Sequence, residues 1–450
     1  MSRLSSIVKA YDIRGVVPDD LDTPLAREFG AAFVSYLGAD RIVIAHDMRE
    51  SSPGLAAAFA AGATAQGADV VDAGLGSTDL LYFASGTLNV PGVMFTASHN
   101  PARYNGMKLC RAGAAPIGLE SGLAEIRDLV EAGVPDADVP PGTVTRQDLL
   151  GEYAEFLLGL VPGVREIRPL KVVVDAGNGM GGLTVPKVFE SLPVELTSMY
   201  FELDGSFPNH EANPIEPENL RDLQAEVRKR GADIGLAFDG DADRCFVVDE
   251  RGETVSPSVL TALIAQRELA REPGATVIHN LITSHAVPEI VREHGGTPVR
   301  TRVGHSFIKA TMAETGAVFG GEHSGHFYFR DFWRADSGML AALHALAALG
   351  SQDGPLSGLL TSYDRYVGSG EVNSEVADTG AALAAVRTAF ADRPGARTDE
   401  LDGLTVEVDG AGWFNVRPSN TEPLLRLNVE AADRASMERL RDEVLAVIRG

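Results

Sequence analysis

The chain has 450 residues, hydrophobic and charged contents of 44% and 23%, and a formal net charge of −24. This length exceeds what one hydrophobic core supports, so three or four domains are expected. The strong negative charge argues against nucleic acid and anionic membranes as partners. An anionic substrate would therefore need a local basic pocket.

Cysteine content and apolar patterning favour a cytoplasmic location. Cys110 and Cys245 lie in apolar runs, where small buried thiols are expected rather than a disulfide. The N-terminal residues lack the apolar core of a signal peptide, and no run of about 18 apolar residues predicts a membrane span. The Ala/Leu-rich run 339–349 is interrupted by His344 and predicts a buried helix.

Short apolar strands that give way abruptly to polar or glycine residues recur along the chain. Between them lie Ala-rich helical stretches such as 55–66, which Ser51-Ser52-Pro53 introduces and Gly67 terminates. This alternation predicts α/β units with largely buried sheets, and the spacing predicts three of them in tandem. The strands expected on this pattern are 42–45, 172–174, 234–238 and 276–278.

The chain changes character near residue 370. Joints between domains are expected at 134–142, 250–252 and 367–370, where Pro, Gly and polar residues gather. Beyond the last joint, the sequence predicts an Ala-rich helix, a turn at 393–395, two short strands around Trp413 and a terminal amphipathic helix. A small α+β domain is therefore expected at the C-terminus.

A serine at the end of a strand is the candidate nucleophile. Ser98 lies in Thr96-Ala97-Ser98-His99-Asn100-Pro101, after the apolar stretch 90–95, and its small neighbours leave Oγ accessible to an anion. Lys108 offers a cation nearby. A Ser-His-Asp hydrolase fits less well, because adjacent residues such as Ser98 and His99 seldom align as nucleophile and base. No G-x-S-x-G motif is present either.

Three alternating carboxylates form the candidate metal site. In Asp239-Gly240-Asp241-Ala242-Asp243-Arg244, a tight loop can converge Asp239, Asp241 and Asp243 on one hard cation such as Mg²⁺. A calcium-binding EF-hand loop is the alternative, since Glu250 falls at its twelfth position. However, Arg244 stands where that loop needs glycine, and both flanks are strand-like. A hydroxyl nucleophile with a divalent cation indicates phosphoryl transfer.

Three further segments carry groups suited to ligands. The first is Gly321-Glu322-His323-Ser324-Gly325-His326, which can approach a sugar ring closely and accept hydrogen bonds from its hydroxyls through Glu322. Arg417-Pro418-Ser419-Asn420-Thr421-Glu422-Pro423 has the composition of a phosphate clamp. His305 and Lys309 lie four residues apart on one face of an expected helix, where they would be charge contacts near a phosphate.

A glycine-rich turn raises a rival hypothesis, a nicotinamide-dependent oxidoreductase. Gly177-Asn178-Gly179-Met180-Gly181-Gly182 matches G-x-G-x-x-G after a strand. The acidic residue expected about 20 positions later is poorly placed, because Glu195 lies inside a strand-like run. A structural strand-to-helix turn is therefore favoured.

Four of these segments, preceded in the chain by Tyr11-Asp12-Ile13-Arg14-Gly15, resemble the α-D-phosphohexomutase superfamily, and most closely its phosphomannomutase/phosphoglucomutase branch. The resemblance implies an α/β fold, with three tandem mixed-sheet α/β domains plus a smaller, mobile C-terminal α+β domain around a central cleft. The matching segments are Tyr11-Asp12-Ile13-Arg14-Gly15, the Ser98 loop, the loop 239–244, 321–326 and 417–423. The implied domains are 1–145 with the phosphoserine, 146–252 with the metal, 253–366 for the sugar and 367–450 for phosphate clamping.

The resemblance also implies roles for individual residues. Ser98 would be the phosphoserine and would bind one Mg²⁺ together with Asp239, Asp241 and Asp243. The residues expected around the transferred phosphate are Arg14, His99, Lys108, Arg244 and His326. The residues expected to bind the substrate are Tyr11, His305, Lys309, Glu322, Ser324, Arg417, Ser419, Asn420 and Thr421.

The implied activity is that of a phosphomannomutase acting on mannose 6-phosphate and mannose 1-phosphate, with glucose phosphates as further substrates. A hexose 1,6-bisphosphate would be both intermediate and activator. Asn420 favours this branch over phosphoglucosamine mutase, which remains the alternative within the superfamily. A non-catalytic sugar-phosphate sensor would need no phosphoserine. The resemblance is compatible with a monomer or a homodimer.

Two positions depart from the usual pattern. The segment Asn280-Leu281-Ile282-Thr283-Ser284 lacks the lysine that is familiar there. A phosphate contact must then come from His305, Lys309 or Arg302. His46 stands where an arginine is common. Neither change touches the nucleophile or the metal loop, but both bear on sugar preference.

Overall fold

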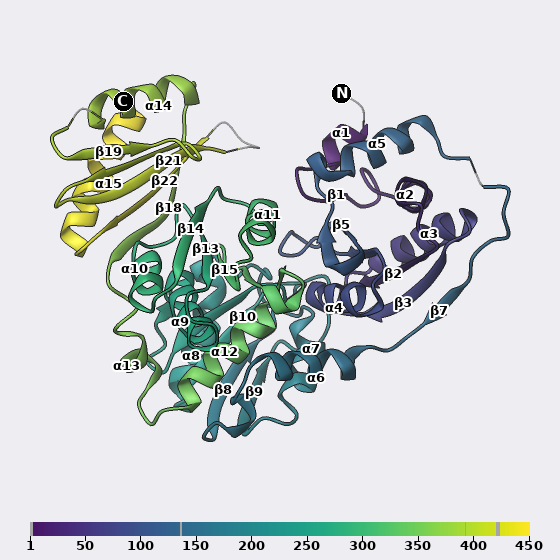
Figure 1. Cartoon of the computed structure of the whole chain (residues 1–450), viewed down its shortest axis with the longest axis horizontal. Coiled ribbons are helices and arrows are strands. Elements are labelled where there is room, and N and C mark those ends of the chain that lie inside the picture. The colour runs from purple at the N-terminus through teal and green to yellow at the C-terminus, as the bar shows by residue number, and fades with distance from the viewer. Residues whose placement is uncertain (1–2, 136, 392, 420–423) are drawn as a thin grey trace. The chain divides into compact units, whose positions relative to one another are not determined.

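Two compact units make up the chain. The computed structural model describes residues 3–135, 137–391, 393–419 and 424–450. The first unit combines residues 1–257 with 324–358, and the second combines 258–323 with 359–450. The chain therefore leaves the first unit, returns to it once and ends in the second (Figure 1).

A mixed sheet forms the N-terminal part of the first unit, with the strand order β1-β5-β4-β2-β3-β7 and with β6 paired to β5. β2 (Arg41–His46) runs parallel to β3 (Asp69–Leu75) and β4 (Gly92–Phe95). β5 (Tyr104–Arg111) returns antiparallel between β4 and β1 (Ile13–Val16). Because His46 pairs with Phe95, the carboxyl ends of β2 and β4 are neighbours. The other strands are β6 (Ala115–Pro116) and β7 (Val144–Arg146).

Close helix packing builds the core against this sheet. A Cβ on Gly30 of α2 would lie 2.1 Å from the Phe59 carbonyl oxygen of α3, and one on Gly62 would lie 1.9 Å from a carbonyl oxygen of α2. Only glycine allows these approaches. The Phe59 ring meets Phe33 and Phe95 at centroid distances of 5.7 and 5.5 Å. The helices are α1 (Arg3–Ile7), α2 (Thr23–Leu37), α3 (Ser52–Ala65), α4 (Thr78–Leu88) and α5 (Leu123–Ala132).

The second sheet of this unit has the order β12-β11-β10-β8-β9. β8 (Leu170–Asp175) runs parallel to β9 (Val194–Met199) and β10 (Ile234–Phe238). β10 and β11 (Cys245–Asp249) form an antiparallel hairpin that is buried at every position, and β12 (Thr254–Val255) pairs with β11. The expected strands 172–174 and 234–238 are present.

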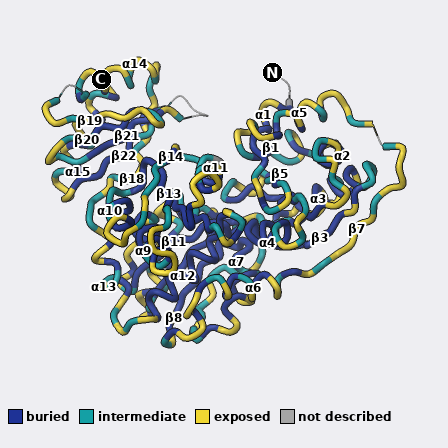
Figure 2. Tube along the Cα trace, in the orientation of Figure 1, coloured by how far each residue is buried: buried dark blue, intermediate teal, exposed yellow. Residues whose placement is uncertain are grey.

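Helix α12 (Gly338–Gly350) is buried along its entire length, which confirms the buried helix expected at 339–349 (Figure 2). Ser337 caps it and also donates to Asp79 Oδ2 at 2.6 Å, which accepts from the Tyr153 hydroxyl at 2.8 Å. This buried carboxylate joins α4, α6 and α12. The remaining elements here are α6 (Leu150–Leu160), α7 (Gly181–Phe189), α8 (Arg221–Arg230), β16 (Phe327–Phe329) and β17 (Ala335–Asp336).

The second unit begins with three parallel strands. β13 (Thr276–Asn280) lies between β14 (Thr297–Thr301) and β15 (Phe319–Gly321). The helices of this part are α9 (Pro257–Arg271), α10 (Ala286–Glu293) and α11 (His305–Thr315). Helix α13 (Leu356–Leu360) spans the point in the chain where the first unit ends and the second resumes.

The C-terminal part is an antiparallel sheet in the order β18-β22-β21-β20-β19 with two helices, richer than the two strands expected around Trp413. The segment 367–370, expected as a joint between domains, forms the start of β18. A register shift between Gly368 and Glu371 accommodates the two glycines of this segment within the strand. The strands are β18 (Val367–Glu375), β19 (Ala396–Asp399), β20 (Leu404–Val408), β21 (Gly412–Pro418) and β22 (Leu424–Ala431). The helices are α14 (Thr379–Phe390) and α15 (Arg434–Arg449).

Short 3₁₀ turns complete the regular structure at Ala112–Ala114, Leu119–Ser121, Val164–Glu166, Pro217–Leu220 and Arg330–Phe332. Among the described residues, no helix is both long enough and apolar enough to cross a bilayer.

Candidate active site

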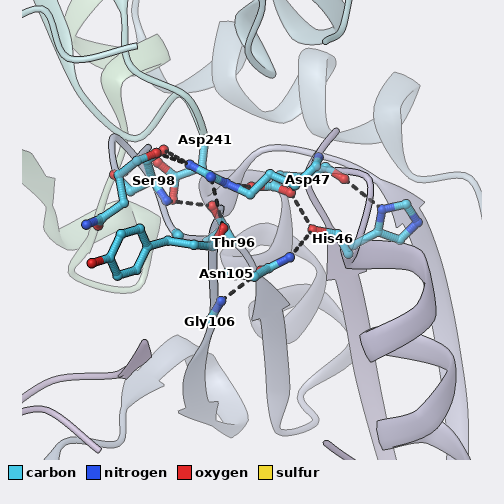
Figure 3. Close-up of polar contacts among 12 residues, drawn as sticks. His46, Asp47, Thr96, Ser98, Asn105, Gly106 and Asp241 are labelled. Atoms are coloured by element: carbon cyan, nitrogen blue, oxygen red, sulfur yellow. Dashed lines mark hydrogen bonds and ion pairs between the residues drawn. The ribbon is translucent and has the colours of Figure 1, made fainter. Parts of the chain in front are cut away.

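Ser98 follows β4 on a loop that directs its hydroxyl at a carboxylate. Its backbone is left-handed, with φ of +49°, an arrangement that surrounding contacts must maintain in a residue other than glycine. The buried Oγ donates to Asp239 Oδ2 at 2.8 Å and lies 3.2 Å from His99 Nδ1. The Ser98 N–H donates to Thr96 Oγ1 at 2.9 Å (Figure 3). The candidate nucleophile therefore touches the first carboxylate of the candidate metal site.

The loop between β10 and β11 brings the three aspartates together. One oxygen from each of Asp239, Asp241 and Asp243 lies within 4.8 Å of the others, and all three residues are buried. A Cβ on Gly240 would lie 2.5 Å from the Ser98 carbonyl oxygen, so glycine is needed for the two loops to touch. The flanking elements are strands, which is incompatible with an EF-hand.

The carboxylate cluster fits a Mg²⁺ ion. Asp241 Oδ1 and Asp243 Oδ1 are buried without a hydrogen-bond partner among the described residues. Their other oxygens accept from Lys108 Nζ, at 2.7 Å for Asp241 and 2.5 Å for Asp243. Buried carboxylate oxygens without donors are unfavourable unless a cation binds them, and oxygen ligands suit Mg²⁺.

Burial and nearby cations set different pKa values within the cluster. Burial raises the pKa of Asp239 to about 7, although Arg244 opposes the shift. Burial would also raise the pKa of Asp241, but Lys108 lies so close that the pKa falls below its usual range. Burial would lower the pKa of Lys108, but Asp241 and Asp243 raise it. Lys108 is therefore charged, and Asp241 ionised, at neutral pH.

Two arginines donate hydrogen bonds to residues near the Ser98 hydroxyl. Arg244 Nε donates to Asp239 Oδ2 at 2.9 Å, and its buried Nη2 has no partner within the described ranges. Arg14 Nη1 donates to Asn100 Oδ1. Burial, reinforced by the two arginines, lowers the pKa of His99 well below its usual value, so its imidazole is neutral. Arg244 Nη2 can therefore donate a hydrogen bond to a phosphate oxygen.

His326, just before β16, lies beside the third aspartate. Its Nε2 is 3.8 Å from Asp243 Oδ1, and its Nδ1 is 2.9 Å from Ser324 Oγ. Tyr11 is half-buried two residues before β1. The first unit thus brings together Ser98, His99, Arg14, Lys108, Asp239, Asp241, Asp243, Arg244 and His326.

Glu322 belongs to the second unit, where it lies next to the loop before α11. Its Oε1 accepts from the Gly304 N–H at 3.1 Å and from Asn280 Nδ2 at 3.3 Å. Lys309 is buried on α11. His305 begins this helix, and its side chain is outside the described part of the structure.

Two arginines face one carboxylate in the C-terminal sheet. Arg417 on β21 pairs across the strands with Arg426 on β22. Glu371 bridges them, at 2.7 Å from Arg417 Nη2 and 3.2 Å from Arg426 Nη1. Both Nε atoms are buried without a partner in the described residues, and Ser419 Oγ lies 3.5 Å from Arg426 Nη2. Two predicted clamp residues fall outside the described ranges, namely Asn420 and Thr421.

The glycine-rich turn at 177–182 packs against the metal-site loop. A Cβ on Gly179 would lie 2.6 Å from the Gly240 carbonyl oxygen, which accepts from the Met180 N–H at 2.8 Å. The space over the turn that a dinucleotide pyrophosphate needs is therefore filled by the loop 239–244. This agrees with the interpretation of the turn as structural.

Sequence reasoning missed the side chains that support these loops. Arg49 donates to the Ser98 carbonyl oxygen at 2.9 Å, and Thr78 Oγ1 donates to Asp241 Oδ2 at 2.6 Å. The sequence contains a signal for Arg49, since Asp47-Met48-Arg49 follows a buried strand as the metal loop does. It contains none for Thr78, whose partner is 163 positions away.

Four family descriptions match this chain in order. They are "Phosphoglucomutase/phosphomannomutase, alpha/beta/alpha domain I" at residues 5–134, domain II at 152–252, domain III at 256–366 and the C-terminal domain at 371–447. These matches confirm the expected fold class of three α/β domains followed by a smaller C-terminal domain.

Individual proteins match over nearly the full length. A protein of Xanthomonas campestris pv. campestris named "Phosphohexose mutases" is 44% identical over 446 residues, covering 98% of this chain and 99% of the relative. A "Phosphomannomutase" of Escherichia coli is 39% identical over 456 residues and 98% of both chains. The crystal structure of a phosphoglucomutase/phosphomannomutase family protein from Burkholderia thailandensis matches with a TM-score of 0.89 and 35% identity, covering 100% of this chain and 98% of that one.

Proposed function

Because the chain belongs to the phosphoglucomutase/phosphomannomutase family, we propose that it interconverts mannose 6-phosphate and mannose 1-phosphate through a phosphorylated Ser98. Members of this family are phosphohexomutases, isomerases that move a phosphate between two positions of a hexose, and this chain is one of them. The observation that carries the role of Ser98 is the 2.8 Å contact of its Oγ with Asp239 Oδ2, inside a cluster that fits Mg²⁺.

In the proposed first half-reaction, the phosphoryl group leaves Ser98 Oγ for the free hydroxyl of a hexose monophosphate. The serine O–P bond breaks and a sugar O–P bond forms. Ser98 Oγ takes up a proton in place of the one that the sugar hydroxyl loses, so the products are a free serine hydroxyl and a hexose 1,6-bisphosphate. Mg²⁺ held by Asp239, Asp241, Asp243 and an oxygen of phosphorylated Ser98 would supply charge stabilisation. Arg244, with its unpartnered Nη2, would donate to the transferring group.

The proton of the attacking sugar hydroxyl must pass to a base, and we assign that role to His326. Its support is the position of Nε2, 3.8 Å from Asp243 Oδ1, while Nδ1 is engaged by Ser324. Lys108 and Arg14 are charged donors rather than bases. His99 lies directly against Ser98 Oγ, so we assign it to the serine and not to the sugar hydroxyl.

In the second half-reaction, the bisphosphate reorients within the site and transfers its other phosphate to Ser98. The phosphate that is not being transferred would bind Arg417, Ser419, Asn420 and Thr421. Support for this comes from the Nε atoms of Arg417 and its neighbour Arg426, which are buried without partners in the described residues. Bisphosphate supplied from solution would also phosphorylate an unmodified Ser98, which makes it an activator.

Sugar hydroxyls would bind Glu322 and Ser324, with Tyr11 as a further substrate contact. The phosphate contact of the absent third-domain lysine would come from His305 or Lys309 on α11. Glu322 is next to the loop that opens that helix, which supports one shared sugar-phosphate site. Arg302 suits this role less well, because its guanidinium lies over the Phe307 ring at 4.6 Å.

Mannose phosphates are proposed as first substrates and glucose phosphates as second. The support is Asn420 in Ser-Asn-Thr-Glu-Pro, together with the name of the Escherichia coli relative. Phosphoglucosamine mutase activity is the alternative. A non-catalytic sensor is disfavoured, because it would not need a hydroxyl in contact with a buried carboxylate cluster.

A coupled mutase assay with Mg²⁺ and a trace of glucose 1,6-bisphosphate tests this function. It compares the 1-phosphates of mannose, glucose and glucosamine, and intact mass measures phosphate on the protein. We expect turnover of mannose 1-phosphate, a gain of one phosphoryl group, and loss of both in Ser98→Ala. Turnover of glucosamine 1-phosphate alone would establish the alternative. Substantial activity in Ser98→Ala would show that the nucleophile is misassigned.

A further inference from the structure

An arginine lies buried beneath the Ser98 loop. Arg49 follows β2 by three residues, and its side chain is 1% exposed. Its pair partner Asp47 is fully buried, and Asp47 Oδ1 accepts from the Arg49 N–H at 3.0 Å and from Ser52 Oγ at 2.5 Å. Figure 3 shows Asp47, Thr96 and Ser98 gathered at the ends of neighbouring strands. Burying a charged pair is unfavourable unless its hydrogen bonds are fully made.

All five N–H donors of the Arg49 side chain are engaged. Nε donates to Asp47 Oδ2 at 3.2 Å. Nη1 donates to the carbonyl oxygens of Pro101 and Tyr104, both at 3.0 Å. Nη2 donates to the carbonyl oxygens of Ser98, at 2.9 Å, and Asn100, at 2.7 Å. Four carbonyls of the loop 98–104 therefore converge on one planar guanidinium.

This convergence fixes the direction in which the Ser98 backbone faces. The Ser98 carbonyl oxygen accepts a hydrogen bond from Arg49. The same oxygen lies so close to Gly240 that no side chain could be added at position 240. The left-handed φ of +49° at Ser98 is unfavourable for serine by itself. Fixing the carbonyl of a residue in that conformation also limits where its side chain can point. The contact of Ser98 Oγ with Asp239 thus depends on the hydrogen bonds by which Arg49 holds the loop 98–104.

A lysine could not replace Arg49 in this arrangement. Its ammonium has three donors on one atom, whereas the guanidinium presents five donors in a plane. At least two of the five acceptors would lose their donor, and buried carbonyls without donors drive a loop to rearrange. The Arg49 side chain is also covered by the Phe207 ring, with 5.1 Å between the guanidinium carbon and the ring centroid. Solvent is therefore poorly able to replace a lost bond.

We propose that Arg49 is a positioning residue for phosphoryl transfer, which holds the loop 98–104 so that the Ser98 hydroxyl stays on the carboxylate cluster. The inference rests on the proposed function of Ser98. Arg49 itself touches no reacting atom: its donors reach backbone carbonyls and Asp47 only. Its effect should appear in the transfer step and leave binding of the sugar phosphate unchanged.

The test compares Arg49→Lys with a matched control, Arg168→Lys. Arg168 also donates to backbone carbonyls and to an aspartate of the first unit, at 3.1 Å to the Gln352 carbonyl oxygen and 3.2 Å to Asp233 Oδ1. Among the described residues, these side-chain hydrogen bonds do not reach the Ser98 loop. Each purified protein is mixed with glucose 1,6-bisphosphate, and intact mass follows phosphate on Ser98 with time. Steady-state kcat and KM, thermal midpoints and hydrogen exchange of the loop 98–104 are measured alongside.

We expect Arg49→Lys to slow phosphorylation of Ser98 and to lower kcat by about 100-fold, the effect of about 1 Å of misplacement. KM should stay within about threefold, and faster exchange should be confined to the Ser98 loop. Arg168→Lys should phosphorylate at the wild-type rate. A merely structural role predicts instead a lower thermal midpoint with an unchanged rate per folded molecule, and that result would overturn the proposal.

A second variant covers the case in which Arg49→Lys fails to fold. Asp47→Asn keeps the guanidinium and removes the charge that orients it through Nε. We expect about tenfold slower phosphorylation with near-wild-type KM, and an unchanged rate would again overturn the proposal. If the wild-type protein itself takes no phosphate on Ser98, the proposed function fails first, and the positioning role fails with it.

Discussion

Replacing Thr78 by valine should weaken metal binding, although it changes none of the three aspartates proposed as metal ligands. Thr78 begins α4 and is completely buried. Its Oγ1 donates to Asp241 Oδ2 at 2.6 Å, while its N–H donates to the Asp241 carbonyl oxygen at 3.0 Å. Valine has nearly the same shape, so Thr78→Val removes the first of these bonds and leaves the second.

The expected magnitude follows from the acceptor's charge. A hydrogen bond to an ionised group contributes about 1.5–3 kcal/mol. Loss of an outer partner of a metal-binding carboxylate typically weakens metal affinity by about 10–100-fold. Because Lys108 still donates to the same oxygen of Asp241 at 2.7 Å, we expect the lower part of this range, about 10–30-fold. Removing the donor also makes the oxygen slightly more basic, which favours binding. The loss of orientation outweighs that gain, because the three aspartate oxygens must stay within 4.8 Å of one another.

The assay is a Mn²⁺ titration in which electron paramagnetic resonance measures the free ion, with no substrate present. Mn²⁺ shares the preference of Mg²⁺ for oxygen ligands. Thr78→Ser keeps the hydroxyl and is the matched control, expected within about threefold of the wild type. Equal Mn²⁺ affinity in Thr78→Val, Thr78→Ser and wild type would refute the idea that this hydroxyl orients Asp241.

Three further predictions concern other parts of the chain. Gly240→Ala should destabilise the protein by about 1–3 kcal/mol through overpacking and sharply reduce turnover, because its Cβ would lie 2.5 Å from the Ser98 carbonyl oxygen. Gly181→Ala, whose Cβ would meet its nearest atoms at 3.4 Å, is the tolerated control in chemical denaturation and in the mutase assay. Arg417→Ala should raise KM for the sugar phosphate by about 10–100-fold with little change in kcat, and a loss confined to kcat would argue against a ground-state clamp. Burial lowers the pKa of His279 to about 4. The unfolded state therefore binds more protons between about pH 4 and 6.5, and stability falls on acidification through this window, by up to about 3 kcal/mol. The difference in unfolding free energy between the wild type and His279→Asn should shrink as pH falls, and a constant difference would contradict this.

Local sequence determined which residues could do chemistry. A buried strand that ends in a tight loop exposes its following residues at one sheet edge, so Ser98 after β4 and the aspartates after β10 were recognisable from the strand pattern alone. Alternation placed Asp239, Asp241 and Asp243 close together because residues two apart in a short loop cannot separate far. The buried helix α12 was likewise encoded in its composition.

The C-terminal sheet was less visible in the sequence. Its strands carry polar and glycine residues, and β18 absorbs two glycines at a register shift, so the pattern there indicated a joint. Antiparallel strands with one solvated face give weaker signals than buried parallel ones. The pairing of Arg417 with Arg426 on Glu371 followed only from strand register.

What only the tertiary structure decided is how the chemical groups are held. Arg49 meets carbonyls about 50 positions away, Thr78 meets Asp241 across 163 positions, and Asp79 meets Ser337 across 258. None of these pairs leaves a periodic or local trace, because each depends on which loops the packed sheets bring to the same edge. The sequence alone pointed to the candidate reactive groups, because local spacing brings them together. Their orientation was decided by packing, since buried donors must find whichever acceptors the fold places beside them.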